Sequence, residues 1–265
     1  MANIHPTAII ESGAKLADTV SVGPYCVIGA DVELDADVQL MSHVVVAGVT
    51  KIGARTRIFP FASIGHEPQD KKFKGEVSSL IVGTDNVIRE HVTFNTGTEG
   101  GGLVTRVGNR GLFMAGCHIA HDCVVGDDVI IANHGTVAGH VVIGDFAFLG
   151  GLAAVHQFCR IGQHAFVGGL SGVERDVIPY GMVVGDRARL VGLNLRGLQR
   201  RDFAKEDIQA LRSAYRMLFA PEGTLVERLE DVAKHFGQVG PVAEIVSFIR
   251  ADSSRAICQP EAGDA

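Results

Sequence analysis

The residues of this 265-residue sequence best suited to chemistry are histidines gathered between His118 and His164. Three of them, His121, His140 and His156, follow one another at intervals near eighteen residues. Imidazole gains and loses a proton near neutral pH, so such residues can act as bases or as metal ligands. Asp122 directly follows His121, and a carboxylate beside a histidine can orient it.

Three interpretations of this group remain open from the residues alone. One histidine could be a general base, oriented by Asp122, with the others donating hydrogen bonds to a substrate. Several histidines could bind zinc and leave a fourth position open. The group could also be solvated surface residues without chemistry.

An aliphatic or aromatic residue recurs at every sixth position and predicts the scaffold beneath the histidines. The positions are Ile4, Ile10, Leu16, Val22, Ile28, Leu34, Leu40, Val46, Ile52, Ile58 and Ile64, then Val82, Ile88 and Phe94, then Val107, Phe113, Ile119, Val125, Ile131, Val137, Ile143, Leu149, Val155, Ile161, Val167 and Val173. A period of six is typical of a parallel β-helix, here predicted to be left-handed. Three hexads form one triangular coil, so His121, His140 and His156 should line one corner of three coils stacked at about 4.8 Å.

Two segments interrupt the hexads and are expected to be substrate loops, near residues 65–81 and 95–106. The interval from Ile64 to Val82 equals eighteen residues and is expected to preserve the phase as one coil. The interval from Phe94 to Val107 is thirteen residues, which predicts a true insertion.

The hexads end near Val177, and helical periodicity then begins. Helices are predicted over 203–219, over 224–236 with Thr224 as N-cap, and over 242–250. The end of the chain from Ser253 is expected to be frayed. The predicted domains are a β-helix over 1–185 and an α-helical C-terminal domain over 186–265.

Composition excludes several classes of protein. A net charge of −6 argues against a globally basic nucleic-acid binder. No apolar run reaches membrane-spanning length and no signal-peptide pattern opens the chain, so we expect a cytoplasmic protein without membrane insertion. Cys26, Cys117, Cys123 and Cys159 all occupy the small-residue position of a hexad, which predicts buried thiols rather than disulfides.

The stretch AGCHIAHDCVVGDDVIIANHGTVAGHVVIGDFAFLGGLAAVHQFCRIGQHAFVGG resembles the bacterial UDP-N-acetylglucosamine O-acyltransferase family, which begins lipid A synthesis. The CHIAHDC, AGH, AVHQF and VGG motifs occur in order, and the resemblance extends over nearly the whole chain. It implies a homotrimer with active sites between adjacent β-helices. It implies transfer of a 3-hydroxyacyl group from acyl carrier protein to the 3-position of UDP-N-acetylglucosamine, without metal or cofactor.

The same resemblance implies roles for individual residues. His121 matches the general base, Asp122 the residue that orients it, and Gly139 the backbone donor to the oxyanion. Gly169 matches the position that limits acyl length. The positions that match substrate contacts are Asp70, Lys72, His118, His140, His156, Gln157, Asn194, Arg200 and Arg201.

The sequence departs from the family pattern at Asn95, Thr96 and Arg196. These departures leave open an acceptor with a 3-amino group, acylated by the same chemistry. A rival class is the γ-carbonic-anhydrase-like zinc trimer, against which the helical region and the AVHQF motif argue. A non-catalytic scaffold would leave the histidines unexplained. Acyl chain length is not indicated.

One stretch of this acidic chain is basic. The stretch from Asp186 to Arg216 contains eight basic and four acidic residues, so its net charge is +4, whereas the whole chain has a net charge of −6. Acyl carrier proteins are strongly acidic, and a basic patch accelerates encounters with such partners. We therefore expect the carrier to dock at the junction between the β-helix and the helical region.

Overall fold

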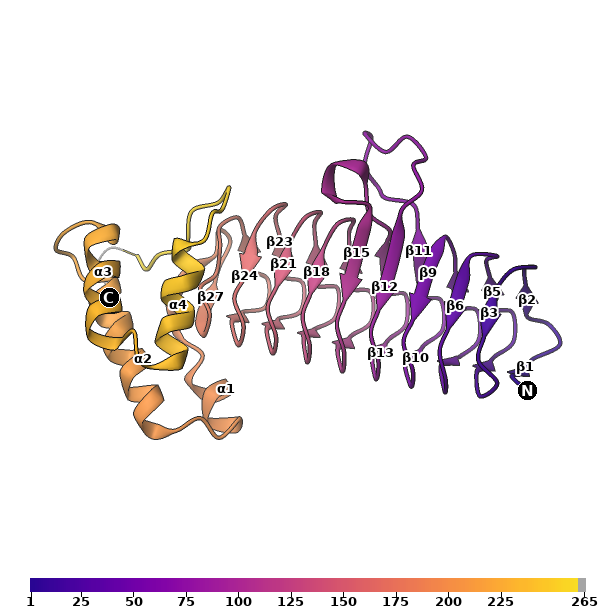
Figure 1. Ribbon diagram of the computed structural model, residues 1–265, viewed down its shortest axis with the longest axis horizontal. Coiled ribbons are helices and arrows are strands. Elements are labelled where there is room, and N and C mark those ends of the chain that lie inside the picture. Colours follow the sequence, from indigo (N-terminus) through magenta and orange to yellow (C-terminus); the bar gives the residue numbers. More distant parts are fainter. Residues whose placement is uncertain (262–265) are drawn as a thin grey trace.

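The computed structural model describes residues 1–261, which form a long three-sided parallel β-helix followed by helices at its C-terminal end (Figure 1). Sheet A contains β1 (Asn3–Ile4), β4 (Ser21–Val22), β7 (Gln39–Leu40), β10 (Arg57–Ile58), β13 (Val87–Ile88), β16 (Leu112–Phe113), β19 (Ile130–Ile131), β22 (Phe148–Leu149), β25 (Phe166–Val167), β27 (Gly181–Val184) and β28 (Arg189–Leu193). Sheet B contains β2 (Ile9–Ile10), β5 (Val27–Ile28), β8 (Val45–Val46), β11 (Ser63–His66), β14 (Thr93–Asn95), β17 (His118–Ile119), β20 (Thr136–Val137), β23 (Ala154–Val155) and β26 (Gly172–Val173). Sheet C contains β3 (Lys15–Leu16), β6 (Val32–Leu34), β9 (Val49–Ile52), β12 (Ser79–Val82), β15 (Val104–Val107), β18 (Val124–Val125), β21 (Val142–Ile143) and β24 (Arg160–Ile161).

The hexad residues fill the interior of the coils, as predicted. Ile28, Ile64 and Ile119 have no exposed surface, and each such burial contributes about 1.5–3 kcal/mol. Ile4 is 42 % exposed because the first coil has no neighbour on its outer side. The predicted parallel β-helix with a helical C-terminal region is confirmed.

Each coil turns three corners, which we name by the sheets they join. In the later coils the AB corner covers residues 132–135, 150–153 and 168–171, the BC corner 120–123, 138–141 and 156–159, and the CA corner 126–129, 144–147 and 162–165. Non-glycine residues take positive φ at these corners, including Asp122 (φ 60°) and His140 (φ 62°). That conformation costs about 1–3 kcal/mol, which hydrogen bonds between coils offset, such as His140 N to His121 O at 3.0 Å.

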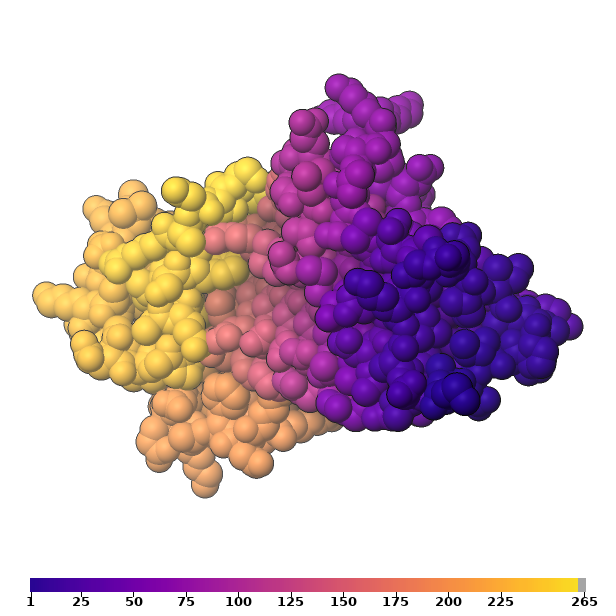
Figure 2. All heavy atoms as spheres, turned by 45° about the vertical axis from the view of Figure 1, so that its right-hand side comes forward, coloured from indigo at the N-terminus to yellow at the C-terminus, as the bar shows by residue number. Residues whose placement is uncertain are grey.

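Both interruptions leave the BC corner and project from one edge of the β-helix (Figures 1 and 2). His121 and His140 lie at the same corner in the following coils. Loop 1 joins β11 to β12 (residues 67–78), and loop 2 joins β14 to β15 (residues 96–103) and contains the 3-10 helix η1 (Glu99–Gly101). The eighteen residues from Ile64 to Val82 were expected to form one coil, and this expectation is wrong. They span one side of the triangle, because Ile58 pairs with Ile88, so loop 1 is an insertion. The insertion predicted for loop 2 is confirmed.

Within the described residues 1–261, four helices follow the β-helix: α1 (Leu195–Arg200), α2 (Lys205–Leu218), α3 (Leu225–Phe236) and α4 (Gly240–Arg250). The three predicted helices match the last three, and Thr224 forms a capping box with Glu227 at the start of α3. The six residues of α1 are too few to show a helical period in sequence. The expected domain boundary at 185 and 186 lies between β27 and β28 and stays a prediction.

The end of the described chain is fixed, so the expected fraying from Ser253 is wrong up to residue 261. Ser253 Oγ donates to buried Asp176 Oδ2 at 2.6 Å, and Cys258 N donates to Asp176 O at 2.7 Å. Asp176 also pairs with Arg160. The four expected buried cysteines and Cys258 are buried free thiols. Within residues 1–261, every helix is too short or too polar to cross a membrane.

Candidate active site

His121 and Asp122 form a buried pair at the BC corner. His121 Nδ1 lies 2.8 Å from Asp122 Oδ2, and the side chains are 5 % and 0 % exposed. Since an ionised carboxylate only accepts hydrogen bonds, it holds the proton on Nδ1 and leaves the Nε2 lone pair available. His121 Nε2 lies 3.9 Å from Asp70 Oδ2 of loop 1, on the open side of the ring. This is the arrangement of an oriented general base.

Gly139 lies directly against the imidazole of His121. A Cβ at residue 139 would overlap the His121 ring, so a glycine is required there. No described residue accepts a hydrogen bond from Gly139 N, whereas Gly139 O accepts one from Phe158 N at 3.2 Å. A backbone N–H beside a base can stabilise an oxyanion.

His140 also lies near the Asp122 carboxylate, beside His121. Its Nδ1 is 3.7 Å from Asp122 Oδ2, and its ring meets that of His121 edge-on with centroids 4.9 Å apart. Phe158 stacks on the other face of His140 at 4.4 Å. Burial lowers the pKa of His140, which favours its neutral form.

His156 shares this corner, as the coil phase predicted, but it is exposed and is not part of the ring stack. Its Nδ1 lies 2.9 Å from Arg255 Nη2, and Arg255 Nε donates to Gln157 O at 3.2 Å. Arg255 could not be predicted from the sequence, because the terminal segment carries no hexad or helical pattern. The nearby His118, on β17, bonds Thr93 Oγ1 through Nδ1 at 2.7 Å, and burial lowers its pKa.

Loop 1 covers this corner and leaves a cavity of about 470 Å³ between itself, loop 2, His140 and Phe158. Asp70, Lys72, Thr98, His140 and Phe158 line it. The structure therefore brings the predicted residues of loop 1 together with the predicted histidines.

The remaining predicted residues lie at other edges of the same chain. Asn194 Nδ2 donates to His164 O at 2.9 Å at the CA corner, and Arg201 lies over the Phe146 ring there at 4.7 Å. Arg200 ends α1 beside them. Gly169 lies at the AB corner, where an added Cβ would be 3.2 Å from Gly151 O.

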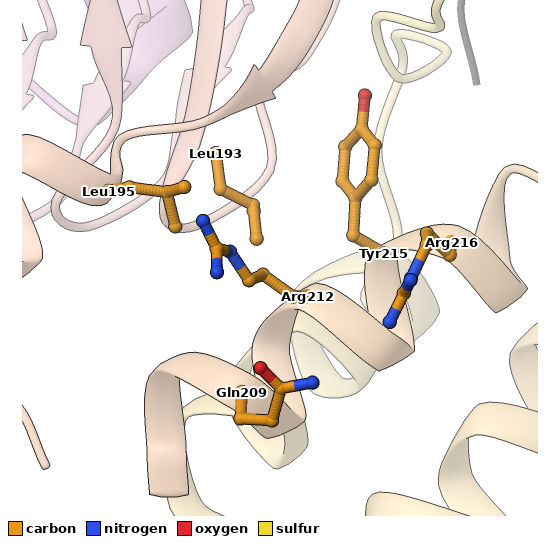
Figure 3. Close-up of a pocket in the computed structure, with 6 residues that line it drawn as sticks. All are labelled: Leu193, Leu195, Gln209, Arg212, Tyr215 and Arg216. Atoms are coloured by element: carbon orange, nitrogen blue, oxygen red, sulfur yellow. The ribbon is translucent and has the colours of Figure 1, made fainter. Parts of the chain in front are cut away.

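A second cavity, of about 340 Å³, lies between β28 and the helices (Figure 3). Leu193 and Leu195 form one wall, and α2 supplies Arg212, Tyr215 and Arg216. Both arginines belong to the basic stretch between Asp186 and Arg216.

Among the described residues, His121, Asp122 and His140 could in principle hold a metal, since their ligand atoms lie within 4.8 Å of one another. Asp122 Oδ2, however, already accepts hydrogen bonds from Thr98 Oγ1 at 2.5 Å and from His121 Nδ1. A zinc ion would need these lone pairs directed at one common point. The geometry favours the general base over the zinc alternative.

A hexapeptide β-helix that carries a carboxylate-bound histidine beside a backbone N–H supplies the base and the oxyanion donor that an acyl-transfer enzyme needs. The family model "Udp N-acetylglucosamine O-acyltransferase; Domain 2" matches residues 176–258. The acyl-[acyl-carrier-protein]–UDP-N-acetylglucosamine O-acyltransferase of Methylobacterium radiotolerans is 62 % identical, with 97 % of this chain and 94 % of the relative covered. That of Caulobacter vibrioides is 56 % identical, with 98 % of each covered.

Structural comparison agrees. The crystal structure of UDP-N-acetylglucosamine O-acyltransferase from Moraxella catarrhalis RH4 is similar with a TM-score of 0.93 at 42 % identity, and 96 % of this chain and 98 % of that chain are covered. The chain belongs to the acyl-[acyl-carrier-protein]–UDP-N-acetylglucosamine O-acyltransferase family.

Proposed function

We propose that this protein transfers a 3-hydroxyacyl group from acyl carrier protein to the 3-hydroxyl of UDP-N-acetylglucosamine, in the cytoplasm, as a step of lipid A biosynthesis. The observation that carries the proposal is the His121–Asp122 pair beneath a loop-covered cavity, in a chain of this family.

The proposed reaction accounts for each proton and bond as follows. His121 Nε2 takes the proton of the sugar 3-hydroxyl as its oxygen attacks the thioester carbon. The oxyanion that forms accepts a hydrogen bond from Gly139 N. The carbon–sulfur bond then breaks, and the imidazolium returns the proton to the leaving thiolate. Asp122 stabilises the positive charge on His121 between these steps, 2.8 Å away.

The cavity under loop 1 is the proposed place of the sugar. Asp70 lies near His121 Nε2 and can accept a hydrogen bond from a sugar hydroxyl. Lys72 lines the same cavity and can form an ion pair with a phosphate of the nucleotide. His140 lines the same space. His118, His156 and Gln157 lie on the adjoining surface and are proposed as further sugar-nucleotide contacts.

Three edges of one chain carry the proposed site residues, and this separation supports a homotrimer. His121 is at the BC corner, Arg201 at the CA corner and Gly169 at the AB corner. Residues at three different edges of one β-helix cannot all contact the same small molecule. A cyclic trimer can place the CA edge of one copy against the BC edge of the next.

Gly169 is proposed to end the groove for the acyl chain. Sheet B connects the BC corner to the AB corner, and Thr136, Ala154 and Gly172 occupy its outward positions beyond His118. These small residues leave room for a hydrocarbon chain to cross the sheet toward Gly169. Burial of each CH₂ there contributes about 0.8 kcal/mol.

The basic junction is the proposed dock of the acyl carrier protein. Arg212 and Arg216 line the cavity of Figure 3 with Leu193 and Leu195. Such a surface attracts an acidic carrier and can bind the phosphate of its pantetheine arm. Arg212→Ala with Arg216→Ala should raise KM for the carrier and flatten the salt dependence of kcat/KM. A response confined to KM for the UDP-sugar would contradict this dock.

The family departures at Asn95 and Thr96 concern the packing of the loops. Asn95 Nδ2 donates to His66 O and Glu67 O, and Thr96 Oγ1 accepts from Ser78 Oγ at 2.9 Å. Both residues are buried, and neither lines the cavity under loop 1. Arg196, the third departure, lies on α1 at the opposite edge.

Mass spectrometry of products tests the proposal directly. The purified protein would be incubated with acyl carrier thioesters of several lengths, with UDP-N-acetylglucosamine or its 3-amino analogue. We expect an ester at the sugar 3-position. An amide formed only on the analogue would move the assignment to the 3-amino acceptor, and no acyl transfer to either sugar would contradict the proposed function.

A further inference from the structure

Loop 2 is the one insertion whose residues bond the buried carboxylate of Asp122. Thr98 N donates to Oδ1 at 2.8 Å and Thr98 Oγ1 donates to Oδ2 at 2.5 Å. The hydroxyl must be the donor, because an ionised carboxylate has no proton to give. Thr98 therefore holds both oxygens of Asp122, while Oδ2 also accepts from His121 Nδ1.

The rest of loop 2 closes around the same carboxylate. An added Cβ at Gly101 would overlap the Asp122 side chain, and one at Gly97 would be 2.8 Å from Asp122 Oδ1. These glycines let the loop pack against the carboxylate and exclude water. Loop 1 supports this packing, because Glu76 Oε1 accepts from Glu99 N at 3.1 Å.

A buried carboxylate without donors is costly, and it would rotate or protonate to find them. Thr98 supplies two of the three hydrogen bonds that fix Asp122. Thr105 Oγ1 fixes the backbone of Asp122 instead, accepting from its N–H at 2.8 Å.

We propose that Thr98 is a positioning residue for the acyl transfer: its hydroxyl and N–H hold Asp122 so that His121 keeps its proton on Nδ1. The inference rests on the proposed function for the role of His121. It gives loop 2 a task in the reaction, and it extends the His121–Asp122 pair to a chain of three residues.

The kinetic test compares Thr98→Val with Thr98→Ser, which keeps the hydroxyl. The matched control is Ser78→Ala, which removes a buried hydroxyl that bonds Thr96 and does not touch Asp122. Thr98→Val should lower kcat about ten- to a hundredfold, the scale of one hydrogen bond to a charged group. Although Thr98 lines the cavity, its hydroxyl is bonded to Asp122 Oδ2, so KM for the UDP-sugar should be nearly unchanged. Thr98→Ser and Ser78→Ala should stay near the wild-type kcat. If Thr98→Val does not fold, Thr98→Ala removes the same hydroxyl with a smaller side chain.

A double variant separates positioning from loop stability. If Thr98 acts through Asp122, Thr98→Val should change kcat by less than about twofold in an Asp122→Asn background. Additive losses in that background, or wild-type kcat in the single variant, would overturn the proposal.

Spectra of the free protein keep this inference separate from the proposed function. In ¹⁵N-histidine spectra, assigned by comparison with His121→Ala, His121 should show a single Nδ1–H tautomer in wild type and Thr98→Ser. Thr98→Val should give a mixture of tautomers. If Thr98→Val keeps the single tautomer, the positioning role of Thr98 is wrong, whatever the substrate is. If His121→Ala keeps the wild-type kcat, only the assignment of His121 as the base is wrong.

Discussion

Two histidines hold similar left-handed positions at different corners of this β-helix, and their surroundings differ. His140 (φ 62°) stacks on Phe158 at the BC corner, and His164 (φ 56°) stacks on Phe146 at the CA corner. His140 faces the Asp122 carboxylate and lines a cavity.

His164 is enclosed by aromatic rings instead. Tyr180 stacks on it at 5.4 Å, the edge of Phe203 meets it, and its buried Nδ1 has no hydrogen-bond partner among the described residues. Burial lowers the pKa of His164 to about 4, with a further contribution from Arg201. The two histidines therefore differ in what adjoins them: a carboxylate and a cavity adjoin His140, whereas aromatic rings cover His164.

The largest expected effect distinguishes the two corners by activity. His121→Ala should lower kcat by about 10²–10⁴, the usual loss for a general base, with the protein still folded. His164→Phe, the matched control at the other corner, should keep most of the wild-type kcat. Steady-state kinetics of both variants measures this difference. A His121→Ala enzyme with wild-type kcat would contradict the assignment of His121 as the general base.

Gly139→Ala should lower kcat by about 10² or more, because the new methyl group must displace the His121 ring. Gly151→Ala is the control, since an added Cβ there meets only Asn133 O, at 3.4 Å. Equal kcat in the two alanine variants would remove Gly139 from the oxyanion site.

His140→Ala should raise KM for the UDP-sugar about tenfold and lower kcat less, because His140 lines the cavity while the proton transfer is assigned by the proposal to His121. His156→Ala should likewise raise KM for the UDP-sugar more than it lowers kcat. Initial rates over a range of UDP-sugar concentration measure this, and a fall in kcat alone would instead give His140 a part in the chemistry.

Gly169→Met should shift preference toward shorter acyl donors, since a side chain at that corner shortens the proposed groove. Each CH₂ excluded costs about 0.8 kcal/mol, so selectivity should change severalfold. Competition between carrier thioesters of different length measures the shift, and an unchanged ranking would place the acyl chain elsewhere.

The smallest expected effect concerns stability. The folded pKa of His164, about 4, lies below the usual value of 6.5, so the unfolded chain binds this proton more readily. The contribution of His164 to stability is therefore complete above pH 6.5 and is lost as pH falls toward 4. His164→Phe should reduce the drop in Tm between pH 7 and pH 5. An equal drop in Tm in the wild type and in His164→Phe would contradict the lowered pKa of His164.

Much of this architecture could be predicted from sequence, because the six-residue period reports directly which side chains point inward. The same count failed from Ile64 to Val82, since an insertion of twelve residues preserves a period of six. Coil phase placed His121 and His140 together but could not identify Phe158 as the stacking partner. Contacts from aperiodic segments, Thr98 to Asp122 and Arg255 to His156, left no sequence signal because they depend on how the loop and the tail fold back.

The central claim is that two copies of the chain complete one site, and mixed trimers test it most directly. Chains with His121→Ala would be co-expressed with chains carrying both Arg200→Ala and Arg201→Ala, and the mixed trimers purified by two tags. At low substrate concentration each parent trimer should be nearly inactive. The purified mixed trimers should show about a third of the wild-type rate, because any cyclic trimer that contains both chains has one interface in three that pairs an intact BC corner with an intact CA corner. Mixed trimers no more active than the parents would contradict a site shared between chains.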